Sequence, residues 1–361
     1  MRKGQLGWRR TRFFATLRMT RPNTRPLARQ LLRLPGLSGI GEHICAGRLR
    51  CATIPRLKGT RNARHTGRHM KTKSMEGARS TDGRARKPRV VVVMPAYNAA
   101  RTLAKTHGDL PKDLVDKAIL VDDASQDDTA TIARQLGLDV IVHVQNKGYG
   151  GNQKTCYIEA LNQGADIVVM LHPDNQYDAT RIPAMIAPIL EGRADLVLGS
   201  RLLSGRAATL KGGMPLWKYV SNRFLTIVEN LSLGTKLSEA HTGFRAYSRK
   251  LLTTIPFLLN SDDFVFDSEV IAQTVAFGFK IAEVPVPTRY FPEASSVNFR
   301  RSVIYGLATL NVSRKYWLHR KGIRRYPIFR RRLSDVLSRE YKERIFGAER
   351  LPGERKAGSR T

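Results

Sequence analysis

The stretch Val90-Val91-Val92-Val93-Met94-Pro95-Ala96-Tyr97-Asn98 decides the fold of this chain, because an unbroken apolar run ends abruptly in turn residues. A helical stretch follows, and the same pattern then repeats. The further apolar runs are Ala118 to Val121, Val140 to Val144, Ile167 to Leu171 and Leu196 to Leu198. Short apolar strands spaced by helices are typical of a mainly parallel sheet that is buried on both faces. The sequence therefore predicts an α/β, Rossmann-like fold with helices flanking the sheet.

Polar side chains gather directly after three of these runs. They are Pro95 to Asn98 after the first run, Asp122 to Asp128 after the second, and His172 to Gln176 after the fourth. In parallel sheets ligands bind beyond the carboxyl ends of the strands. Acidic groups that meet at one edge repel unless a cation or a donor-rich ligand lies between them, so we expect a ligand site here. Asp127 and Asp128 also suit a plain N-cap role before the helix expected over 129–136.

A glycine cluster, Gly148-Tyr149-Gly150-Gly151, follows the third run and precedes a helix expected over 152–162. It matches neither the dinucleotide-binding GxGxxG motif nor an ATP-binding P-loop, because no Gly-Lys-Ser/Thr ends it and it does not follow the first strand. Glycines here indicate either close approach of the backbone to a ligand or a tight turn. The sequence leaves both interpretations open.

The 361 residues carry a formal net charge of +32, and the excess lies at the two ends. Residues 1–89 hold 24 basic and 3 acidic side chains, residues 90–299 hold 20 and 22, and residues 300–361 hold 18 and 5. A nucleic-acid-binding domain would carry basic charge across its folded face. No nucleic-acid partner is therefore expected, although a protein that binds nucleic acid through its basic ends is the alternative from another functional class.

The cellular compartment is predicted from three cysteines and from the lack of long apolar stretches. Cys45, Cys51 and Cys156 form neither a disulfide framework nor a zinc motif. No segment reaches the length of about 18 apolar residues that a membrane span needs, and Phe13 to Leu17 is too short for a signal peptide. We expect a cytoplasmic protein, at most peripheral at the inner face of the membrane.

Three regions are expected along the chain. Residues 1–88 show no sustained helical or strand period, so they are expected to be disordered, or to be an upstream region wrongly included before a start at Met70 or Met75. An Arg-rich targeting peptide and a nucleic-acid-binding arm are the other interpretations. Residues 89–298 form the predicted catalytic domain, and residues 299–361 form a basic, partly helical extension.

Taken together, these motifs resemble the family 2 glycosyltransferases of GT-A fold, within the branch that includes dolichyl- and polyprenyl-phosphate sugar synthases. The likeness extends over roughly Arg89 to Tyr316. It implies an inverting, metal-dependent hexosyltransferase that uses a UDP- or GDP-sugar as donor. By this resemblance the nucleotide-binding residues are Pro95, Ala96, Tyr97, Asn98, Asp122, Asp123, Lys147, Gly148 and Gly150.

The resemblance also implies a metal site after the fourth strand. Asp174-Asn175-Gln176 looks like the family's DxD-type motif, so Asp174 and Gln176 are predicted to hold Mn²⁺ or Mg²⁺. His172 stands where the family commonly has an acidic residue. An imidazole ligand would suit Mn²⁺ better than Mg²⁺, whereas the alternative is that His172 only packs or hydrogen-bonds at the strand end. With an acidic ligand replaced, a catalytically dead scaffold is also conceivable.

The predicted chemistry is set by the charge that develops on the leaving diphosphate. A divalent ion on Asp174 would bridge the two phosphates, and Arg201 of the Gly-Ser-Arg element and Arg245 of the Thr-Gly-Phe-Arg element could add charge-assisted hydrogen bonds. Lys218 and Ser221 match the branch's acceptor-phosphate residues approximately. The predicted acceptor is therefore a polyprenyl phosphate, and a glycan hydroxyl in cell-surface polysaccharide synthesis is the alternative.

The two acceptors differ in their need for a base. A lipid monophosphate is already ionised near neutral pH, whereas a hydroxyl acceptor requires a carboxylate base. Asp262, Asp263 and Asp267 are the candidates, with Asp267 within a helical stretch over 264–276. Their alternative role is to cap that helix and to complement its dipole.

The C-terminal region favours a membrane-surface acceptor. From Phe299 to Leu318 apolar and aromatic residues mix with Arg300, Arg301, Arg314 and Lys315, and a basic aromatic run from Arg324 to Arg332 follows. An interfacial helix with a polybasic flank would bind an anionic membrane surface. Ordinary core packing of this helix with a solvated basic tail is the alternative.

Overall fold

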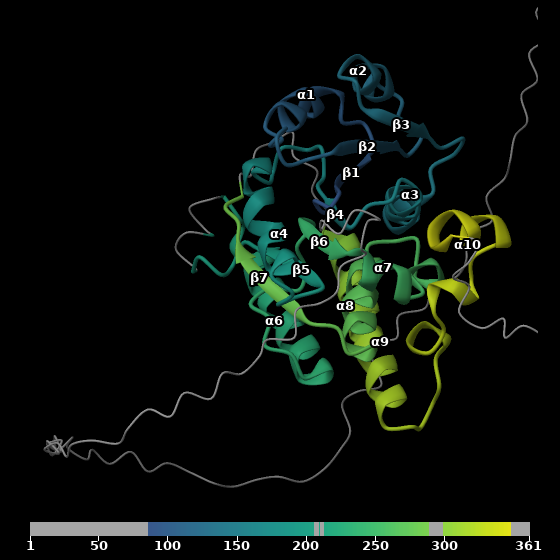
Figure 1. Ribbon diagram of the computed structural model, residues 1–361. Coiled ribbons are helices and arrows are strands. Elements are labelled where there is room, and N and C mark those ends of the chain that lie inside the picture. The colour runs from purple at the N-terminus through teal and green to yellow at the C-terminus, as the bar shows by residue number, and fades with distance from the viewer. Residues whose placement is uncertain (1–85, 206–208, 210–212, 289–298, 348–361) are drawn as a thin grey trace, which may run out of the picture. The chain divides into compact units, whose positions relative to one another are not determined.

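The computed structural model describes residues 86–205, 209, 213–288 and 299–347 (Figure 1), all within the unit 72–361. Nearly all of the extension predicted over 1–88 thus lies outside the described residues, as do residues 348–361 of the predicted C-terminal extension.

A seven-stranded sheet in the order β3-β2-β1-β4-β6-β5-β7 forms the centre of the fold. All neighbouring strands run parallel except β6, which is antiparallel to both β4 and β5. The strands are β1 (Val90–Ala96), β2 (Lys117–Asp122), β3 (Asp139–Val142), β4 (Ile167–Met170), β5 (Leu196–Ser200), β6 (Arg245–Ser248) and β7 (Ile281–Pro285). The predicted α/β class with a mainly parallel sheet is confirmed.

Helices cover both faces of the sheet, as Figure 1 shows. They are α1 (Ala100–Gly108), α2 (Thr129–Gln135), α3 (Gly148–Asn162), α4 (Ile182–Leu190), α6 (Leu216–Leu233), α7 (Arg249–Thr254), α8 (Phe266–Ala276), α9 (Phe299–Arg320) and α10 (Arg339–Phe346). Short 3-10 turns lie at Ala179–Arg181, Phe257–Leu259, Pro327–Phe329 and Leu333–Asp335.

The apolar run of β1 is continuous because both of its faces are buried. Val91 and Val93 pack into the core shared with α3 and α8, whereas Val90 and Val92 pack into the core shared with α1 and α4. Successive side chains of a strand point to opposite faces, so a strand between two helical layers has no position for a polar residue.

Backbone strain is concentrated at the carboxyl edge of the sheet. Among the described residues other than glycine, Asn98, Ala124 and Asn175 have positive φ, at 52°, 61° and 55°. They follow β1, β2 and β4 respectively. A left-handed conformation is unfavourable for Ala124 above all, and such residues cluster at functional sites. The edge of the sheet that the sequence predicts as a ligand site is therefore also the edge at which the backbone is strained.

Candidate active site

The turn after β1 exposes only part of its predicted nucleotide-binding motif. Pro95 and Ala96 continue the buried strand, whereas Tyr97 is 54% exposed and Asn98 is exposed beside it. The Asn98 side chain accepts a hydrogen bond from Gln126 N (2.9 Å), and Asn98 N donates to Ser125 Oγ (2.8 Å). Asn98 therefore ties the ends of β1 and β2 together, and Tyr97 is the side chain of this motif most open to a nucleotide.

The two aspartates at the end of β2 turn inward, and their expected contact with the base and ribose stays a prediction. Asp123 is 3% exposed, and its carboxylate accepts hydrogen bonds from Lys147 N (2.8 Å) and Gly148 N (3.0 Å) while lying 2.7 Å from His143 Nδ1. Asp122 is 2% exposed and binds Ser125. Free N–H groups at a helix N-terminus attract a carboxylate, so Asp123 caps the start of α3.

The glycine cluster lies inside α3, which begins at Gly148 and not at residue 152 as expected. Gly148 has a φ of +83°, and a Cβ there would lie 2.7 Å from Asp262 O. Gly150 N donates to the same carbonyl at 2.8 Å. The lack of a Cβ at Gly148 and Gly150 thus lets the backbone of residues 261–262 come close. The close backbone approach expected at these two glycines is therefore made to the chain itself. Lys147, the exposed N-cap of α3, is the member of this motif whose side chain can reach a phosphate.

A cavity of about 250 Å³ brings together predicted residues from four parts of the chain. Gln176, Arg201, Lys218, Ser221 and Asp267 all line it. The other lining residues are Tyr149, Met214, Trp217, Asn222, Leu225, His241, Gly243, Phe264, Ser302 and Tyr305. Gln176 of the metal motif therefore shares this space with acceptor-motif and candidate base residues, whereas Asp174 and His172 are not among the lining residues.

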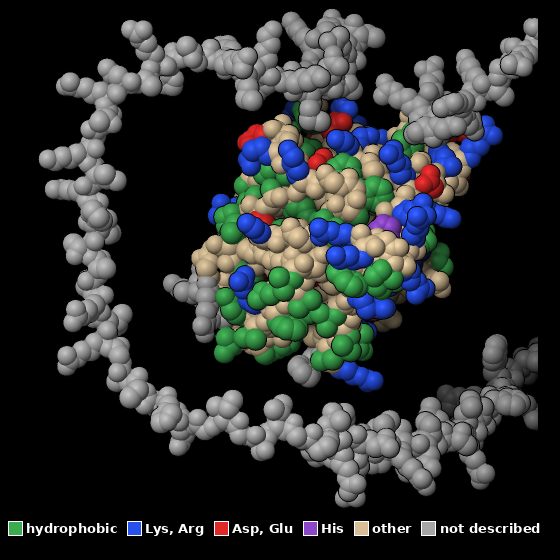
Figure 2. Space-filling view, turned by 90° about the horizontal axis from the view of Figure 1, so that it is seen from below, with side chains coloured by type: hydrophobic (Ala, Val, Ile, Leu, Met, Phe, Trp, Pro, Cys, Tyr) green, Lys and Arg blue, Asp and Glu red, His purple; other side chains and the backbone are tan. Residues whose placement is uncertain are grey.

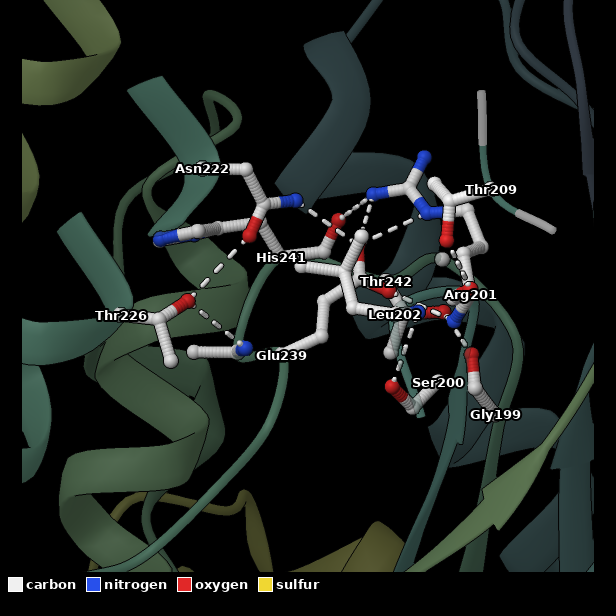
Figure 3. Close-up of polar contacts among 12 residues, drawn as sticks. Gly199, Ser200, Arg201, Leu202, Thr209, Asn222, Thr226, Glu239, His241 and Thr242 are labelled. Atoms are coloured by element: carbon white, nitrogen blue, oxygen red, sulfur yellow. Dashed lines mark hydrogen bonds and ion pairs between the residues drawn. The ribbon is translucent and has the colours of Figure 1, made fainter. Parts of the chain in front are cut away.

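Arg201 is fixed at the wall of this cavity by a buried carboxylate (Figure 3). Its Nε donates to Glu239 Oε1 at 2.7 Å, its backbone N donates to Oε2 at 2.7 Å, and an Nη donates to His241 O at 2.7 Å. Asn222 donates to the same Glu239 oxygen at 2.8 Å. Burial raises the pKa of Glu239, but the charge and hydrogen bonds of Arg201 outweigh it and hold that pKa below its usual range. Arg201 is thus a pre-oriented cation at the cavity.

Lys218 is a second cation at the same cavity. It lies in the first turn of α6, with its Nζ 5.6 Å from the centre of the Trp217 ring. Burial, and then the like charge of Arg201, lowers the pKa of Lys218. Two cations that raise each other's energy favour an anion between them, so this corner of the cavity is suited to a phosphate.

Asp267 lines the cavity from the first turn of α8, and neighbouring side chains contact its carboxylate. Its Oδ2 accepts a hydrogen bond from Tyr149 (2.8 Å), and Gln153 and Arg245 lie 3.4 Å and 3.6 Å from its Oδ1. The N-cap of α8 is Val265, so Asp267 does not cap the helix, but it lies in the first turn, where it complements the helix dipole as the other part of its alternative role requires.

Arg245 lies beneath the site and not in it, which corrects its predicted contact with phosphate. It has no exposed surface, and its guanidinium donates to the carbonyls of Thr242 (2.8 Å), Ala240 (3.1 Å) and Asp267 (3.1 Å). A buried charge needs such partners. Arg245 is therefore a positioning residue for Asp267 and for the loop before β6.

The loop after β4 carries the predicted metal motif. Asp174 Oδ1 accepts a hydrogen bond from Gln176 N at 3.0 Å, and Gln176 lines the cavity. His172 instead stacks on Tyr149, with ring centres 5.4 Å apart, and its Nε2 lies 3.3 Å from the Tyr149 hydroxyl. This arrangement favours the packing interpretation of His172.

The donor set nevertheless fits a substrate-borne cation. Within residues 86–205, 209, 213–288 and 299–347, no three His, Cys, Asp or Glu side chains form a metal-binding group. Mg²⁺ in particular is commonly held by one or two carboxylates together with substrate phosphates and water, without a complete protein cage. The Asp174 carboxylate and the Gln176 amide oxygen, both hard ligands, meet that requirement.

Sequence reasoning missed several residues of the cavity. Tyr149 lay within the quoted glycine cluster but received no role, His241 directly precedes the Thr-Gly-Phe-Arg element, and Tyr305 was hidden in the predicted C-terminal helix. A signal existed for Tyr149, because it is the only side chain in a run of glycines. No sequence signal pairs His241 with Tyr305, which are 64 positions apart yet joined by a 2.6 Å hydrogen bond.

Comparison with known proteins agrees with this geometry. The model of the family "Glycosyl transferase family 2" matches residues 91–255. An uncharacterised protein of Methanocaldococcus jannaschii is 31% identical over 204 residues, which are 56% of this chain and 83% of that protein. The chain belongs to glycosyl transferase family 2.

Relatives of this glycosyltransferase include enzymes named for lipid phosphates. The UDP-N-acetylglucosamine–dolichyl-phosphate N-acetylglucosaminyltransferase of Methanococcus voltae is 29% identical and covers 56% of this chain and 86% of its own length. The undecaprenyl-phosphate mannosyltransferase of Micrococcus luteus is 29% identical over 63% of this chain and 93% of its own length.

A crystal structure supports the fold assignment. Glucosyl-3-phosphoglycerate synthase of Mycobacterium tuberculosis superimposes with a TM-score of 0.50 at 23% identity, over 66% of this chain and 81% of its own. The likeness confirms the GT-A-like architecture of the glycosyltransferase.

Proposed function

We propose that this family 2 glycosyltransferase transfers a sugar from a UDP- or GDP-sugar to a polyprenyl phosphate, with inversion and with help from Mn²⁺ or Mg²⁺. The observation that carries the proposal is the cavity in which Arg201 and Lys218 converge beside Gln176. A monophosphate acceptor matches the two cations, and the names of the two lipid-phosphate relatives point to the same acceptor class.

The chain's own residues divide the work of this reaction. The anomeric carbon–oxygen bond to the diphosphate breaks while an acceptor phosphate oxygen forms a new bond to the opposite face of that carbon. Arg201 and Lys218 hold the acceptor phosphate, which needs no base because it is already ionised. Asp174 and Gln176 would hold a divalent ion, which supplies charge neutralisation to the leaving diphosphate. Lys147, the N-cap residue of α3, would meet the donor's phosphates.

The surface beside the cavity suits a lipid acceptor. Figure 2 shows hydrophobic side chains gathered on the face seen from below, with Lys and Arg around them. Exposed large apolar side chains on α6 and α9 are Leu216, Trp217, Val220, Phe224, Ile227, Leu231, Val303, Ile304, Leu307 and Trp317. The two helices pack against each other, and Trp217 also lines the cavity. An acceptor phosphate could therefore enter from a membrane on which these helices rest.

Both interpretations of the C-terminal helix apply, each to a different face. Val312 and Tyr316 of α9 pack into the core, as ordinary packing requires. Val303, Ile304 and Leu307 are about half exposed, as an interfacial helix requires. None of the described helices is long and apolar enough to cross a bilayer.

Transfer assays with the full chain test the proposal. UDP- and GDP-sugars are offered with Mn²⁺ or Mg²⁺ and with either undecaprenyl phosphate in detergent or a free oligosaccharide. We expect a lipid-linked product, and we expect Lys218→Gln to raise the KM for the lipid phosphate about tenfold by removing a charge-assisted hydrogen bond. Lys236→Gln, an exposed lysine outside the cavity, is the matched control. Transfer to the oligosaccharide alone would contradict the proposal and favour Asp267 as a base.

A further inference from the structure

Three polar side chains form a line from α6 to α9 at the back of the cavity. Glu229 Oε2 lies 3.3 Å from His241 Nε2, and His241 Nδ1 lies 2.6 Å from the Tyr305 hydroxyl. The His241 and Tyr305 rings meet edge to face at 5.5 Å, and both residues line the cavity. Glu229 lies behind them at 2% exposure. The line therefore connects a hidden carboxyl group to a hydroxyl at the cavity wall.

At the inner end of this line, both carboxyl oxygens of Glu229 and Nε2 of His241 are buried without a formed hydrogen bond among the described residues, although Oε2 and Nε2 lie 3.3 Å apart. The Ser268 hydroxyl also faces Glu229. Buried polar atoms rarely remain unpaired. A proton shared between Glu229 and His241 satisfies both groups, so the protonation of this pair fixes the direction of every hydrogen bond along the line.

Burial keeps the pair uncharged below neutral pH. It raises the pKa of Glu229 to about 7, where Arg245 and Asp267 are the charged groups that face it. It lowers the pKa of His241 to about 3, where Glu239, Arg245 and Arg201 face it. A protonated Glu229 donates to Nε2, and the neutral imidazole then carries its hydrogen on Nδ1 and donates it to the Tyr305 oxygen. Burial also raises the pKa of Tyr305, so its hydroxyl keeps a hydrogen to donate elsewhere.

We propose that the Tyr305 hydroxyl is an acceptor-binding group that donates a hydrogen bond to the acceptor phosphate, and that His241 and Glu229 are positioning residues that hold it in the donating orientation. The inference rests on the proposed function, since it takes the ligand of the cavity to be a phosphate monoester.

The same three residues turn the hydrogen of the Tyr305 hydroxyl away from the cavity when Glu229 loses its proton. The carboxylate then accepts the hydrogen of Nε2, Nδ1 becomes an acceptor, and Tyr305 donates to Nδ1 and no longer into the cavity. A negative charge also arises behind an anionic ligand, which weakens binding further. Affinity for the acceptor phosphate should therefore fall as pH rises through the pKa of Glu229.

Binding of decyl phosphate to the full chain, measured by calorimetry without donor or metal, tests the contact itself. At about pH 6 we expect Tyr305→Phe to weaken binding about tenfold, the size of one hydrogen bond to a charged group. Tyr316→Phe is the matched control, because it makes the same change on α9 at a buried residue outside the cavity. It should bind like the unaltered protein.

The pH profile of Glu229→Gln tests the positioning. The side-chain amide of this variant donates to Nε2 at every pH, so the variant should bind like the unaltered protein at about pH 6 and about tenfold more tightly than it at about pH 8. The phosphate's own second ionisation, near pH 6, affects both proteins equally. The ratio of the two dissociation constants therefore reports Glu229 alone.

The outcomes separate this inference from the proposed function. If the unaltered protein binds decyl phosphate but Tyr305→Phe binds equally well, or the ratio stays flat with pH, the inference is overturned and the proposed function stands. If the unaltered protein does not bind decyl phosphate at any pH, both are overturned.

Discussion

The two halves of the site differ in where their charged side chains point. In the donor half, built from β1, β2 and α3, Asp122 and Asp123 turn inward and bind the chain's own N–H and hydroxyl groups. In the acceptor half, built from the end of β5, α6, α8, α9 and the loop before β6, Arg201 and Lys218 line the cavity. A strand end thus determines which edge carries a residue, whereas nearby hydrogen-bond donors and acceptors decide whether it faces the ligand.

The difference has a physical origin in the helices behind each half. The start of α3 offers free N–H groups that attract a carboxylate, so the donor half supplies its own partners for Asp123. The acceptor half sets Glu239 against Arg201 and brings Lys218 to the same corner. Arg201 is thus also paired within the chain, and Lys218 is the cation that would gain most from an anion supplied by a substrate. Both halves therefore satisfy their buried charges internally, and the acceptor half adds Lys218 at the cavity.

The largest effect is expected where the two halves meet, at the metal motif. Asp174→Ala should reduce transfer about 1,000-fold or more, because the cation on the diphosphate is worth several kcal/mol in the transition state. The fold should persist, since Asp174 lies on a partly exposed loop. Asp128→Ala removes an exposed aspartate that makes no capping hydrogen bond and serves as the control. Transfer rates with saturating Mn²⁺ decide the matter; near-normal turnover in Asp174→Ala would remove the motif from the chemistry.

The free energy of unfolding should fall more when the buried ion pair of the acceptor half is broken than when an exposed charge of the donor half is removed. Arg245→Met deletes the guanidinium that three carbonyls and Asp267 share, and it leaves a carboxylate without its cation. Breaking a buried pair in this way costs about 3–5 kcal/mol. Urea denaturation measures the loss, with the exposed Arg134→Met of α2 as control. A loss below about 1 kcal/mol would show that Asp267 is adequately held by Tyr149 alone.

The unfolding free energy measured over a range of pH should reveal how much the burial of Glu229 in the acceptor half destabilises the fold. Burial raises the pKa of Glu229 from 4.5 to about 7, so its contribution to stability is fully present below about pH 4.5 and is lost as pH rises through about 7. The shift corresponds to about 3 kcal/mol. Glu229→Gln should therefore gain up to that amount over the unaltered protein between about pH 5 and 8. Equal slopes of unfolding free energy against pH would assign Glu229 an ordinary pKa.

The sequence predicted the sheet and five of the fifteen residues that line the cavity, and it failed where contacts join distant segments. The run Val90–Met94 indicates a strand buried on both faces because no polar residue interrupts it. Gln176, Arg201, Lys218, Ser221 and Asp267 were placed by motif order, and they do share one cavity. No local sequence pattern predicts that Asp123 faces α3, or that Arg245 lies beneath Asp267. These orientations depend on partners about 20 positions away, and side-chain direction follows from packing.

The smallest effects should come from the surface around the acceptor half. Arg300 and Arg314 lie on the face of α9 that carries the exposed Ile304, Leu307 and Trp317, by helical spacing. Each basic residue near an anionic membrane is worth about 1 kcal/mol. The pair Arg300→Gln with Arg314→Gln should therefore weaken co-sedimentation with phosphatidylserine vesicles by about 2 kcal/mol in all.

The salt dependence separates the two contributions to this binding. Screening shortens the reach of the charges to about 8 Å at physiological ionic strength and to about 3 Å at 1 M salt. At 1 M salt the contribution of the basic residues to vesicle binding should therefore vanish, while apolar contact by Trp217, Phe224 and Leu231 should persist. Arg101→Gln with Arg134→Gln changes two exposed arginines of α1 and α2, in the donor half, and should leave vesicle binding unchanged. Equal weakening by both pairs would mean that overall charge, and not the α6 and α9 face, attracts the protein to the lipid; the acceptor half would then have no privileged contact with the membrane.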